Sequence, residues 1–399
     1  MTRLDRLIAE LCPDGVRSAT LGDIGDVCMC KRIFKEQTET NGDVPFYKIG
    51  TFGKEPDAFI SQELFDEYRS KYSFPKVGDI LISAAGTIGR TVIYNGEPAY
   101  FQDSNIVWLD NDERILLNKF LYYLYALHPW AVSTGGTIAR LYNDNIRKAK
   151  IPLPPLPIQQ EIVRILDKFT ELTAELTAEL TARRGQYEFY RNKLLSNNNV
   201  ELKTIGEIAS KCFWIMPSTP KFSTENIVPY ITSKNLKNGK IDFTNVKYIS
   251  HHDYESISNN RKILTDDILV GMIGTLGEMA IVKNSDFEFY GQNMYLIRLN
   301  KTKISTKYFY YFFNNDSMKN YLRSIKNVSS QGYLKAQHIE NIKIPLPALD
   351  EQARIVAILD RFDALTTDIA SGLPAEIEAR RKQYEHYRDK LLTFKDKAA

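Results

Sequence analysis

Apolar residues recur every three or four positions through two long segments of this chain, with polar residues between them. The first stripe runs through residues 158–195 and the second through residues 355–391. This spacing is that of one face of an α-helix, so we expect two long amphipathic helices. The positions expected to form the core between them are Ile162, Leu166, Phe169, Leu172, Leu176, Leu180, Ile355, Leu359, Phe362, Leu365 and Ile369.

The two striped segments are copies of one sequence. IPLPPLPIQQEIVRILDKF and ARRGQYEFYRNKLL, within residues 151–195, return as IPLPALDEQARIVAILDRF and ARRKQYEHYRDKLL, within residues 344–392. The leading prolines lack a backbone donor and hold the preceding residues extended, so each helix has a stiff entry. Because a lone amphipathic helix of this length cannot bury its stripe, we expect the copies to pack as an antiparallel coiled coil. Gly372 and Pro374 predict a break near residues 371–374 of the second copy.

The sequence before each copy is β-rich. GDILISAAGTIGRTVIY from Gly78 resembles DDILVGMIGTLGEMAIV from Asp266, and both alternate apolar and polar residues between turn residues. We therefore predict an α+β chain with two β-rich globular domains and two long helices, related by pseudo-twofold duplication. The expected division is a first globular domain with a short N-terminal helix (1–150), a first long helix (151–196), a second globular domain (197–343), a second long helix (344–394) and a tail (395–399).

Composition narrows the class of protein. The chain has 399 residues, of which 43% are hydrophobic, and no apolar run approaches the length of a membrane span. Its first residues carry charges where a signal peptide would be apolar, so we expect a cytoplasmic protein. The cysteines form no CxxC pair and the five histidines show no metal-ligand spacing, so we expect free thiols and no metal. The cysteines are Cys12, Cys28, Cys30 and Cys212.

Motifs of catalysis are not found. The glycine loops 86–89 and 274–277 lack the Lys-Ser/Thr of a phosphate-binding loop and the spacing of a dinucleotide site, so we interpret them as tight turns. No motif of an amino-methyltransferase occurs. The D/E-x-K triplet of metal-dependent nucleases occurs only at residues 201–203, without a suitable context. We therefore expect a non-catalytic chain that binds no cofactor itself.

Basic residues gather in both globular domains, although the net charge is only +3. Taken singly, most are ordinary solvated charges. Taken as two clusters interleaved with Tyr and Asn, they favour contact with DNA phosphates and base edges. The clusters are Lys31, Arg32, Lys35, Arg69, Lys71 and Arg140 in the first domain, and Lys221, Lys234, Lys237, Lys240, Arg261, Lys262 and Lys335 in the second.

This arrangement resembles the specificity subunit of type I restriction-modification enzymes. The duplicated segments ending in RxxQYExYRxxLL carry the resemblance, and the TAEL run at residues 171–180 is similar to the subgroup with repeats in its spacer helix. The resemblance implies two target recognition domains, each reading half of a bipartite asymmetric DNA site, with the helix pair setting the spacer. It also implies modification subunits that bring S-adenosylmethionine, and restriction subunits that use ATP and Mg²⁺.

The family's plan places base-reading residues in loops of each domain. It implies DNA contacts around residues 31–35, 69–71 and 137–142 in the first domain, including Thr137 and Tyr142, and around residues 234–240, 261–262 and 331–335 in the second, including Gln331 and Tyr333. Modification subunits would contact the helices through Arg183, Arg184, Arg380 and Arg381. Two alternatives remain: a coiled-coil adaptor joining two protein-binding domains, and an enzyme with an unfamiliar site.

Inserting a third TAEL unit after Leu180 tests the helix as a spacer. Four residues lengthen a helix by about 6 Å and rotate the rest of the helix by about 40°. One base pair of B-DNA spans about 3.4 Å and about 34°. We expect the insertion to change the spacer of the recognised DNA site by about one base pair, with both half-sites unchanged, as measured by mapping methylated adenines in the host genome. An unchanged spacer or an altered half-site would contradict this idea.

Overall fold

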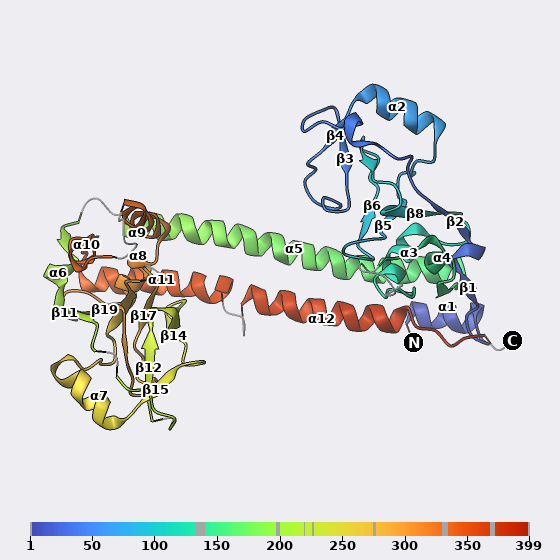
Figure 1. Cartoon of the computed structure of the whole chain (residues 1–399). Helices are drawn as coiled ribbons and strands as arrows, with labels where there is room; N and C mark the ends of the chain where they lie inside the picture. Colours follow the sequence, from blue (N-terminus) through green and yellow to red (C-terminus); the bar gives the residue numbers. More distant parts are fainter. Residues whose placement is uncertain are drawn as a thin grey trace. The chain divides into compact units, whose positions relative to one another are not determined.

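The computed structural model describes residues 2–132, 140–196, 200–218, 220–225, 227–273, 277–328, 334–367 and 372–397 (Figure 1). The chain divides into two compact units. The first unit is Met1–Leu176 with Ile377–Ala399, and the second unit is Thr177–Glu376. Each unit joins a globular part to the helical segments beside it, so the division falls within the long helices. Helix α5 (Leu156–Leu195) belongs to both units.

The described residues of the first unit form three small sheets. One has the order β2-β8-β5-β6, the second has the order β4-β3-β7 with β3 and β7 parallel, and the third pairs β1 with β9. The strands are β1 (Ser18–Thr20), β2 (Gly25–Cys28), β3 (Val44–Tyr47), β4 (Phe59–Ile60), β5 (Ile80–Ser83), β6 (Thr91–Ile93), β7 (Tyr100–Phe101), β8 (Ile106–Asn111) and β9 (Lys150–Pro152). The helices are α1 (Arg3–Leu11), α2 (Gln62–Lys71), α3 (Asn118–Tyr125) and α4 (Asn143–Arg147), with 3-10 turns η1 (Leu21–Asp23) and η2 (Lys35–Gln37).

The second unit repeats this topology. Its sheets have the orders β11-β19-β16-β17, β15-β12-β18 and β10-β20, with β12 and β18 parallel. An additional hairpin, β13 (Leu236–Lys237) with β14 (Lys240–Ile241), follows β12. The remaining strands are β10 (Leu202–Thr204), β11 (Ala209–Ile215), β12 (Val228–Thr232), β15 (Lys247–Ile249), β16 (Ile268–Gly271), β17 (Met279–Ile281), β18 (Tyr290–Gln292), β19 (Met294–Leu299) and β20 (Lys343–Pro345). The helices are α6 (Ile205–Ile208), α7 (His251–Ser258), α8 (Thr306–Phe313), α9 (Asp316–Val328) and α10 (Ala336–Glu340), with η3 (Ser233–Asn235) and η4 (Asn259–Arg261).

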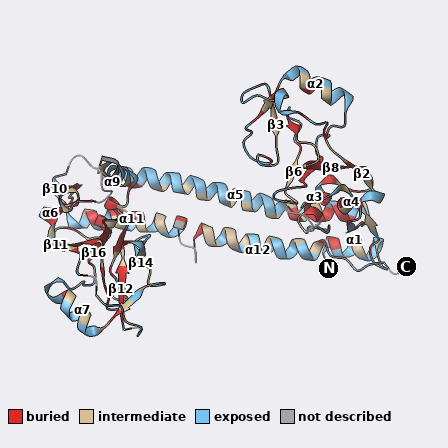
Figure 2. Cartoon of the chain, in the orientation of Figure 1, coloured by how far each residue is buried: buried red, intermediate tan, exposed pale blue. Residues whose placement is uncertain are grey.

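The four-stranded sheet of each unit lies between two apolar cores. In β5, Ile80 and Ile82 belong to the core shared with α3, whereas Leu81 belongs to the core shared with β3 and β7. In β16, Ile268 and Leu269 divide between two cores in the same way. This alternation follows from the two-residue period of a strand, and Figure 2 shows these strands as buried. The predicted α+β class and its duplication are confirmed.

Each unit pairs its part of α5 with a helix from the second sequence copy. In the first unit, Phe169 of α5 stacks on Tyr387 of α12 (Leu373–Leu391), with ring centroids 5.5 Å apart. In the second unit, Tyr190 of α5 stacks on Phe362 of α11 (Leu349–Thr367) at 5.8 Å. The described residues of the second copy form two helices, α11 and α12. Of the break expected near residues 371–374, residue 371 lies outside the described residues, as do residues 368–370. The paired helices run side by side in Figure 1.

The helix stripe is buried only near the globular parts. Of the expected core positions, Ile162, Leu166, Ile355 and Leu359 are buried, while Phe169, Leu176, Leu180 and Phe362 are half-buried. Leu172 and Leu365 are 45% and 38% exposed, so the expectation that they form core is wrong. Away from the globular parts, the long helices are coloured mostly as exposed (Figure 2). A single neighbouring helix shields only one side of a leucine there. Ile369 lies outside the described residues.

The end of the chain pairs with its beginning inside the first unit. The Val16 N–H donates to the Lys395 carbonyl at 2.8 Å, and the Lys397 N–H donates to the Val16 carbonyl at 3.0 Å. Gly15 has φ +108°, and a Cβ there would lie 2.6 Å from the Lys395 carbonyl oxygen, so this close approach requires glycine. The expected tail is thus held by hydrogen bonds as far as Lys397.

A buried glutamine fixes the start of each long helix to its globular part. In the first unit, the Leu117 N–H donates to Gln159 Oε1 at 2.9 Å. Gln159 Nε2 donates to the carbonyls of Ile115 and Pro154 at 2.9 and 2.8 Å. Both the donor and acceptor sides of a wholly buried amide are thereby satisfied. We call this arrangement the glutamine clamp.

The second unit has the same clamp. Ser305 N–H donates to Gln352 Oε1 at 2.8 Å, and Gln352 Nε2 donates to the carbonyls of Lys303 and Pro347, both at 2.9 Å. Gln352 is also wholly buried. The loop before α8 is therefore tied to α11 as the loop before α3 is tied to α5.

An aspartate two helical turns further along repeats the attachment. Asp167 accepts hydrogen bonds from Lys119 Nζ at 3.1 Å and from the Tyr123 hydroxyl at 2.5 Å. Asp360 accepts from Lys307 Nζ and the Tyr311 hydroxyl, both at 2.6 Å. Burial and the hydrogen bond to the neighbouring carboxylate raise the pKa of each tyrosine far above its usual value, so both remain donors at neutral pH.

Gln159→Leu tests the clamp in the first unit. The substitution leaves one N–H and two carbonyl groups buried without partners, so we expect the free energy of unfolding to fall by about 3 kcal/mol or more. Urea unfolding measures the loss, and faster hydrogen exchange at the Leu117 amide locates it. The neighbouring Gln160 is exposed, so Gln160→Leu should change stability by about 0.5 kcal/mol or less. Equal effects of the two substitutions would contradict the clamp.

Candidate nucleic-acid interface

A turn at Asp103 and Ser104 holds two of the expected DNA contacts in the first unit. Arg32 Nε and Nη2 lie 2.9 and 2.8 Å from Asp103 Oδ2, and Arg140 Nη2 donates to the Ser104 carbonyl at 3.1 Å. Asp103 raises the pKa of Arg32. The Arg32 side chain is 60% exposed. The turn therefore orients two guanidinium groups while leaving Arg32 open to solvent.

A second group of cations lies on aromatic rings at the end of α2. Arg69 lies over Phe74 with 5.4 Å between its guanidinium carbon and the ring centroid, and Lys31 Nζ lies 5.1 Å from the Tyr72 centroid. The Tyr100 hydroxyl donates to the Lys31 carbonyl at 3.0 Å and fixes the loop after β2. Cations held on aromatic faces are suited to phosphates and to stacking on bases.

The other candidate DNA contacts of the first unit lie outside these two groups of cations. Lys71 is exposed and pairs with Glu67 at 2.9 Å. Tyr142 caps α4, is 54% exposed and lies under Arg140, with 5.8 Å from the guanidinium carbon to the ring centroid. Lys35 is exposed on η2. Thr137 lies outside the described residues.

The second unit has a cation group after α7. Arg261 lies over Phe213 at 5.9 Å, and its carbonyl accepts from the Tyr290 hydroxyl at 3.3 Å, as the Lys31 carbonyl does from Tyr100. Lys262 lies over Tyr254 at 5.6 Å and pairs with Glu255 at 3.1 Å. Both units thus set basic residues on an aromatic surface, with different residues in each.

Sequence reasoning missed Lys211 in this group. Lys211 Nζ lies 5.4 Å from the Phe213 centroid and donates to the Asn260 carbonyl at 2.8 Å. The signal was present, because residues two apart in a strand such as β11 share one face.

The remaining candidates of the second unit lie on separate surface segments. Lys237 and Lys240 flank the turn of the β13-β14 hairpin, where Asn238 and Gly239 both have positive φ, as a two-residue hairpin turn requires. Lys237 pairs with Asp242 at 2.7 Å. The exposed residues of other segments are Lys221 before β12, Lys234 in η3 and Lys335 before α10. Gln331 and Tyr333 lie outside the described residues.

The cysteines are chemically quiet. All four are free, and burial raises the pKa of Cys30 and Cys212 to about 12. Among the described residues, no group of three or more His, Cys, Asp and Glu side chains could hold a metal ion. Within the same residues, no helix is long and apolar enough to cross a membrane.

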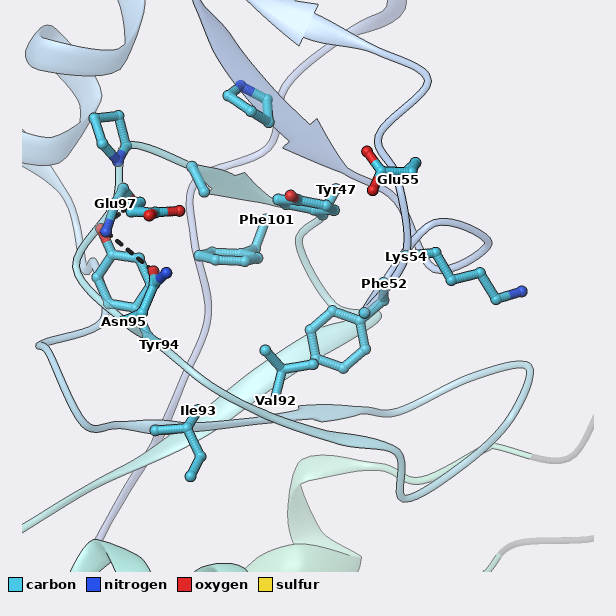
Figure 3. Close-up of a pocket in the computed structure, with 14 residues that line it drawn as sticks. Tyr47, Phe52, Lys54, Glu55, Val92, Ile93, Tyr94, Asn95, Glu97 and Phe101 are labelled. Atoms are coloured by element: carbon cyan, nitrogen blue, oxygen red, sulfur yellow. Dashed lines mark hydrogen bonds between the residues drawn. The ribbon is translucent and has the colours of Figure 1, made fainter. Parts of the chain in front are cut away.

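A cavity of about 400 Å³ lies in the first unit, and none of the candidate contacts lines it (Figure 3). Phe52 and Phe101 are buried in its walls, and Glu55 and Glu97 are exposed at its lining. Burial, together with these two carboxylates, raises the pKa of Tyr47. Two acids against the single base Lys54 make this cavity a poor match for phosphate.

The arginines expected to contact partner subunits repeat on both long helices. Arg183 Nη1 donates to Gln186 Oε1 at 3.1 Å, and Arg380 Nη1 donates to Gln383 Oε1 at 3.3 Å. Arg184 and Arg381 are exposed. The large apolar side chain of Phe189, five residues after Arg184 on α5, is 60% exposed. Each unit therefore presents a similar helix surface to solvent.

Comparison with known sequences identifies related proteins. The sequence model for the type I restriction modification DNA specificity domain matches residues 13–183 and 195–379. A Haemophilus influenzae protein described as a type I restriction enzyme specificity subunit is 62% identical over 180 residues, or 44% of this chain and 47% of that protein. The EcoR124I/EcoR124II specificity subunit of Escherichia coli is 35% identical over 307 residues, or 71% of this chain and 72% of that subunit.

Solved structures share the fold. The HsdS subunit from Thermoanaerobacter tengcongensis has a TM-score of 0.53 and 15% identity, covering 96% of this chain and 97% of that one. A chain from a structure on complex assembly and conformational transition of the type I R-M system has a TM-score of 0.60 and 15% identity, covering 96% and 98%.

Proposed function

Because the chain belongs to the family of type I restriction-modification DNA specificity domains, we propose that each of its units reads one half of a bipartite, asymmetric DNA site. It is accordingly a non-catalytic specificity subunit. The observation that carries the proposal is that the two units share one strand topology but carry different residues on their surfaces. Both units set cations on aromatic rings at the sheet and helix ends, but with different residues, as two different half-sites would require.

In this proposal the long helices set the distance between half-sites. Helix α5 is continuous over 40 residues, whereas the second copy is divided into α11 and α12. The glutamine clamps support the proposal, because they attach helix and reading domain rigidly in each unit. A change in helix length would then be transmitted to the reading surfaces.

Partner subunits would supply the chemistry. Two modification subunits would bind the exposed helix surfaces that carry Arg183, Arg184, Arg380 and Arg381, and would bring S-adenosylmethionine for adenine methylation. Restriction subunits would bring ATP and Mg²⁺. The alternative is a coiled-coil adaptor that joins two protein-binding domains, and such a chain would show no sequence-specific affinity for DNA.

Exchanging residues 1–150 for the corresponding domain of another family member tests the modular assignment. We expect one half-site of the methylated sequence to be replaced, with the other half-site and the spacer retained. Mapping methylated adenines in cells that carry the hybrid measures all three features. Replacement of both half-sites would contradict the assignment, and binding without any DNA specificity would favour the adaptor.

Arg32→Gln tests the reading surface of the first unit. We expect it to weaken binding to the mapped DNA site by about 1 kcal/mol or more, which is the usual range for an arginine that contacts a base. Fluorescence anisotropy with a labelled duplex measures the affinity. Arg114 is a matched control, because it is also exposed and paired with an aspartate, Asp112, at 2.6 Å. Arg114→Gln should leave the affinity unchanged, and equal losses would remove Arg32 from the interface.

A further inference from the structure

A second cavity, of about 590 Å³, lies within the second unit and is not explained by any sequence motif. Residues of α5, α8, α11 and the β13-β14 hairpin line it, together with Asn314 directly after α8. Its chemistry differs from that of the cavity in Figure 3, because three basic residues line it against one acid.

The first basic residue is Arg191 of α5, which is 9% exposed. Its Nη2 pairs with Asp316 at 2.9 Å, and its guanidinium carbon lies 5.2 Å from the Tyr187 ring centroid. Its Nε is buried and has no hydrogen-bond partner in the part of the chain that the structure describes. Arg191 lines the cavity, so it places a positive charge at the wall that α5 forms.

The other two basic residues are Lys237 and Lys240, on either side of the hairpin turn. The turn is fixed in place. A Cβ at Gly239 would lie 2.7 Å from the Tyr310 ring, and the Gly239 carbonyl accepts from the Ile281 N–H at 3.2 Å. The hairpin therefore holds its lysines at the cavity without freedom to swing away as a unit.

The neutral lining groups add donors. Asn238 and Asn314 contribute amides, and Asn314 Nδ2 donates to the Tyr310 hydroxyl at 3.3 Å. Burial raises the pKa of Tyr187 to about 12 against the opposing effect of Arg191, so its hydroxyl stays protonated at neutral pH. Asp363 is the acid of the lining, and it already has an interaction of its own.

The first unit lacks the hairpin that closes this cavity. By the sequence repeat, Tyr384 and Arg388 correspond to Tyr187 and Arg191, and Arg388 also lies over its tyrosine, at 5.8 Å. Arg388 pairs with an aspartate, Asp389, at 2.7 Å, as Arg191 does with Asp316. The difference lies in the hairpin, because the fully described loop 48–58 between β3 and β4 forms no strand pair. The hairpin and its two lysines are thus an addition of the second unit.

We propose that this cavity binds a phosphate group, supplied by the DNA backbone next to the second half-site. The assignment rests on the proposed function for its source of phosphate. Arginine and lysine with amide donors are the groups that bind backbone phosphates in protein–DNA complexes. The hairpin would carry the contact, and Arg191 would fix the phosphate from the helix that sets the spacer. The position of the second unit on its half-site would then be coupled to the helix that sets the spacer length.

A methylphosphonate scan of the mapped DNA site tests this inference. Each backbone phosphate is replaced in turn by a neutral methylphosphonate, and the affinity of the full chain is measured. We expect the affinity to fall when the replaced phosphate is one of one or two next to the second half-site. Lys237→Gln with Lys240→Gln should weaken binding to unmodified DNA about tenfold, lower the salt slope by about one to two, and abolish the loss at those phosphates.

Two further variants separate the cavity from general charge. Asn314→Ala removes an uncharged donor, and Ala126 occupies the corresponding position of the first unit, so the fold should tolerate it. The loss of affinity caused by methylphosphonate at the same phosphates should also be smaller in this variant. Lys283 is exposed in the same unit and does not line the cavity. Lys283→Gln should keep the wild-type profile.

The outcomes are distinct. In the first, the wild-type chain and the lysine variant both bind DNA with the same methylphosphonate profile, while calorimetry detects no binding of inorganic phosphate. That result would overturn the cavity inference and leave the proposed function standing. If the wild-type chain binds inorganic phosphate, the lysine variant does not, and both have the same methylphosphonate profile, the cavity is a phosphate site. The idea that DNA supplies the phosphate would then be overturned. A wild-type chain without site-specific DNA binding would overturn the proposed function, and calorimetry with inorganic phosphate would then decide the cavity alone.

Discussion

In each unit, the attachment of the long helix depends on a buried glutamine side chain whose amide oxygen and nitrogen must both be hydrogen-bonded. Gln159 and Gln352 each bridge a proline-rich entry segment and the loop before a short helix. A half-satisfied amide in such a place is worse than an apolar side chain, so the geometry around it has little freedom. Since the long helix begins at this point, its direction relative to the globular part is set by hydrogen bonds and not by the weak packing of its exposed middle.

The long helices combine strongly and weakly held regions. Ile162 and Leu166 lie in a core with α3, whereas Leu172 is almost half exposed. Isolated helices gain little stability from propensity alone, so the ends must stabilise the middle. A region with few tertiary contacts is also one where changes of length disturb little else. The position of the TAEL run in this poorly covered stretch is therefore physically reasonable.

The sequence was informative wherever local pattern or duplication decided the structure. The helix stripe, the proline entries and the repeated strands around Ile80 and Ile268 were all predictable. The exposure of Leu172 was not, because it depends on how many neighbours cover a helix, which periodicity does not record. The basic clusters were found, but the ring beneath Arg261, Phe213 of β11, comes from a distant part of the sequence. Lys211 and Arg191 were missed although their rings, Phe213 and Tyr187, lie on the same strand and the same helix as the cations themselves.

The closure of the chain's end onto Val16 has a consequence for the order of folding. The second unit is contiguous, from Thr177 to Glu376, and can fold as soon as it has been synthesised. The first unit needs α12 and the pairing of Lys395 and Lys397 with Val16, so it stays open until residues 377–397 have been synthesised. A ribosome that stops after residue 376 would release a chain with one finished reading domain and one that lacks its second helix. Completion of the first unit therefore depends on the pairing of Lys395 and Lys397 with Val16.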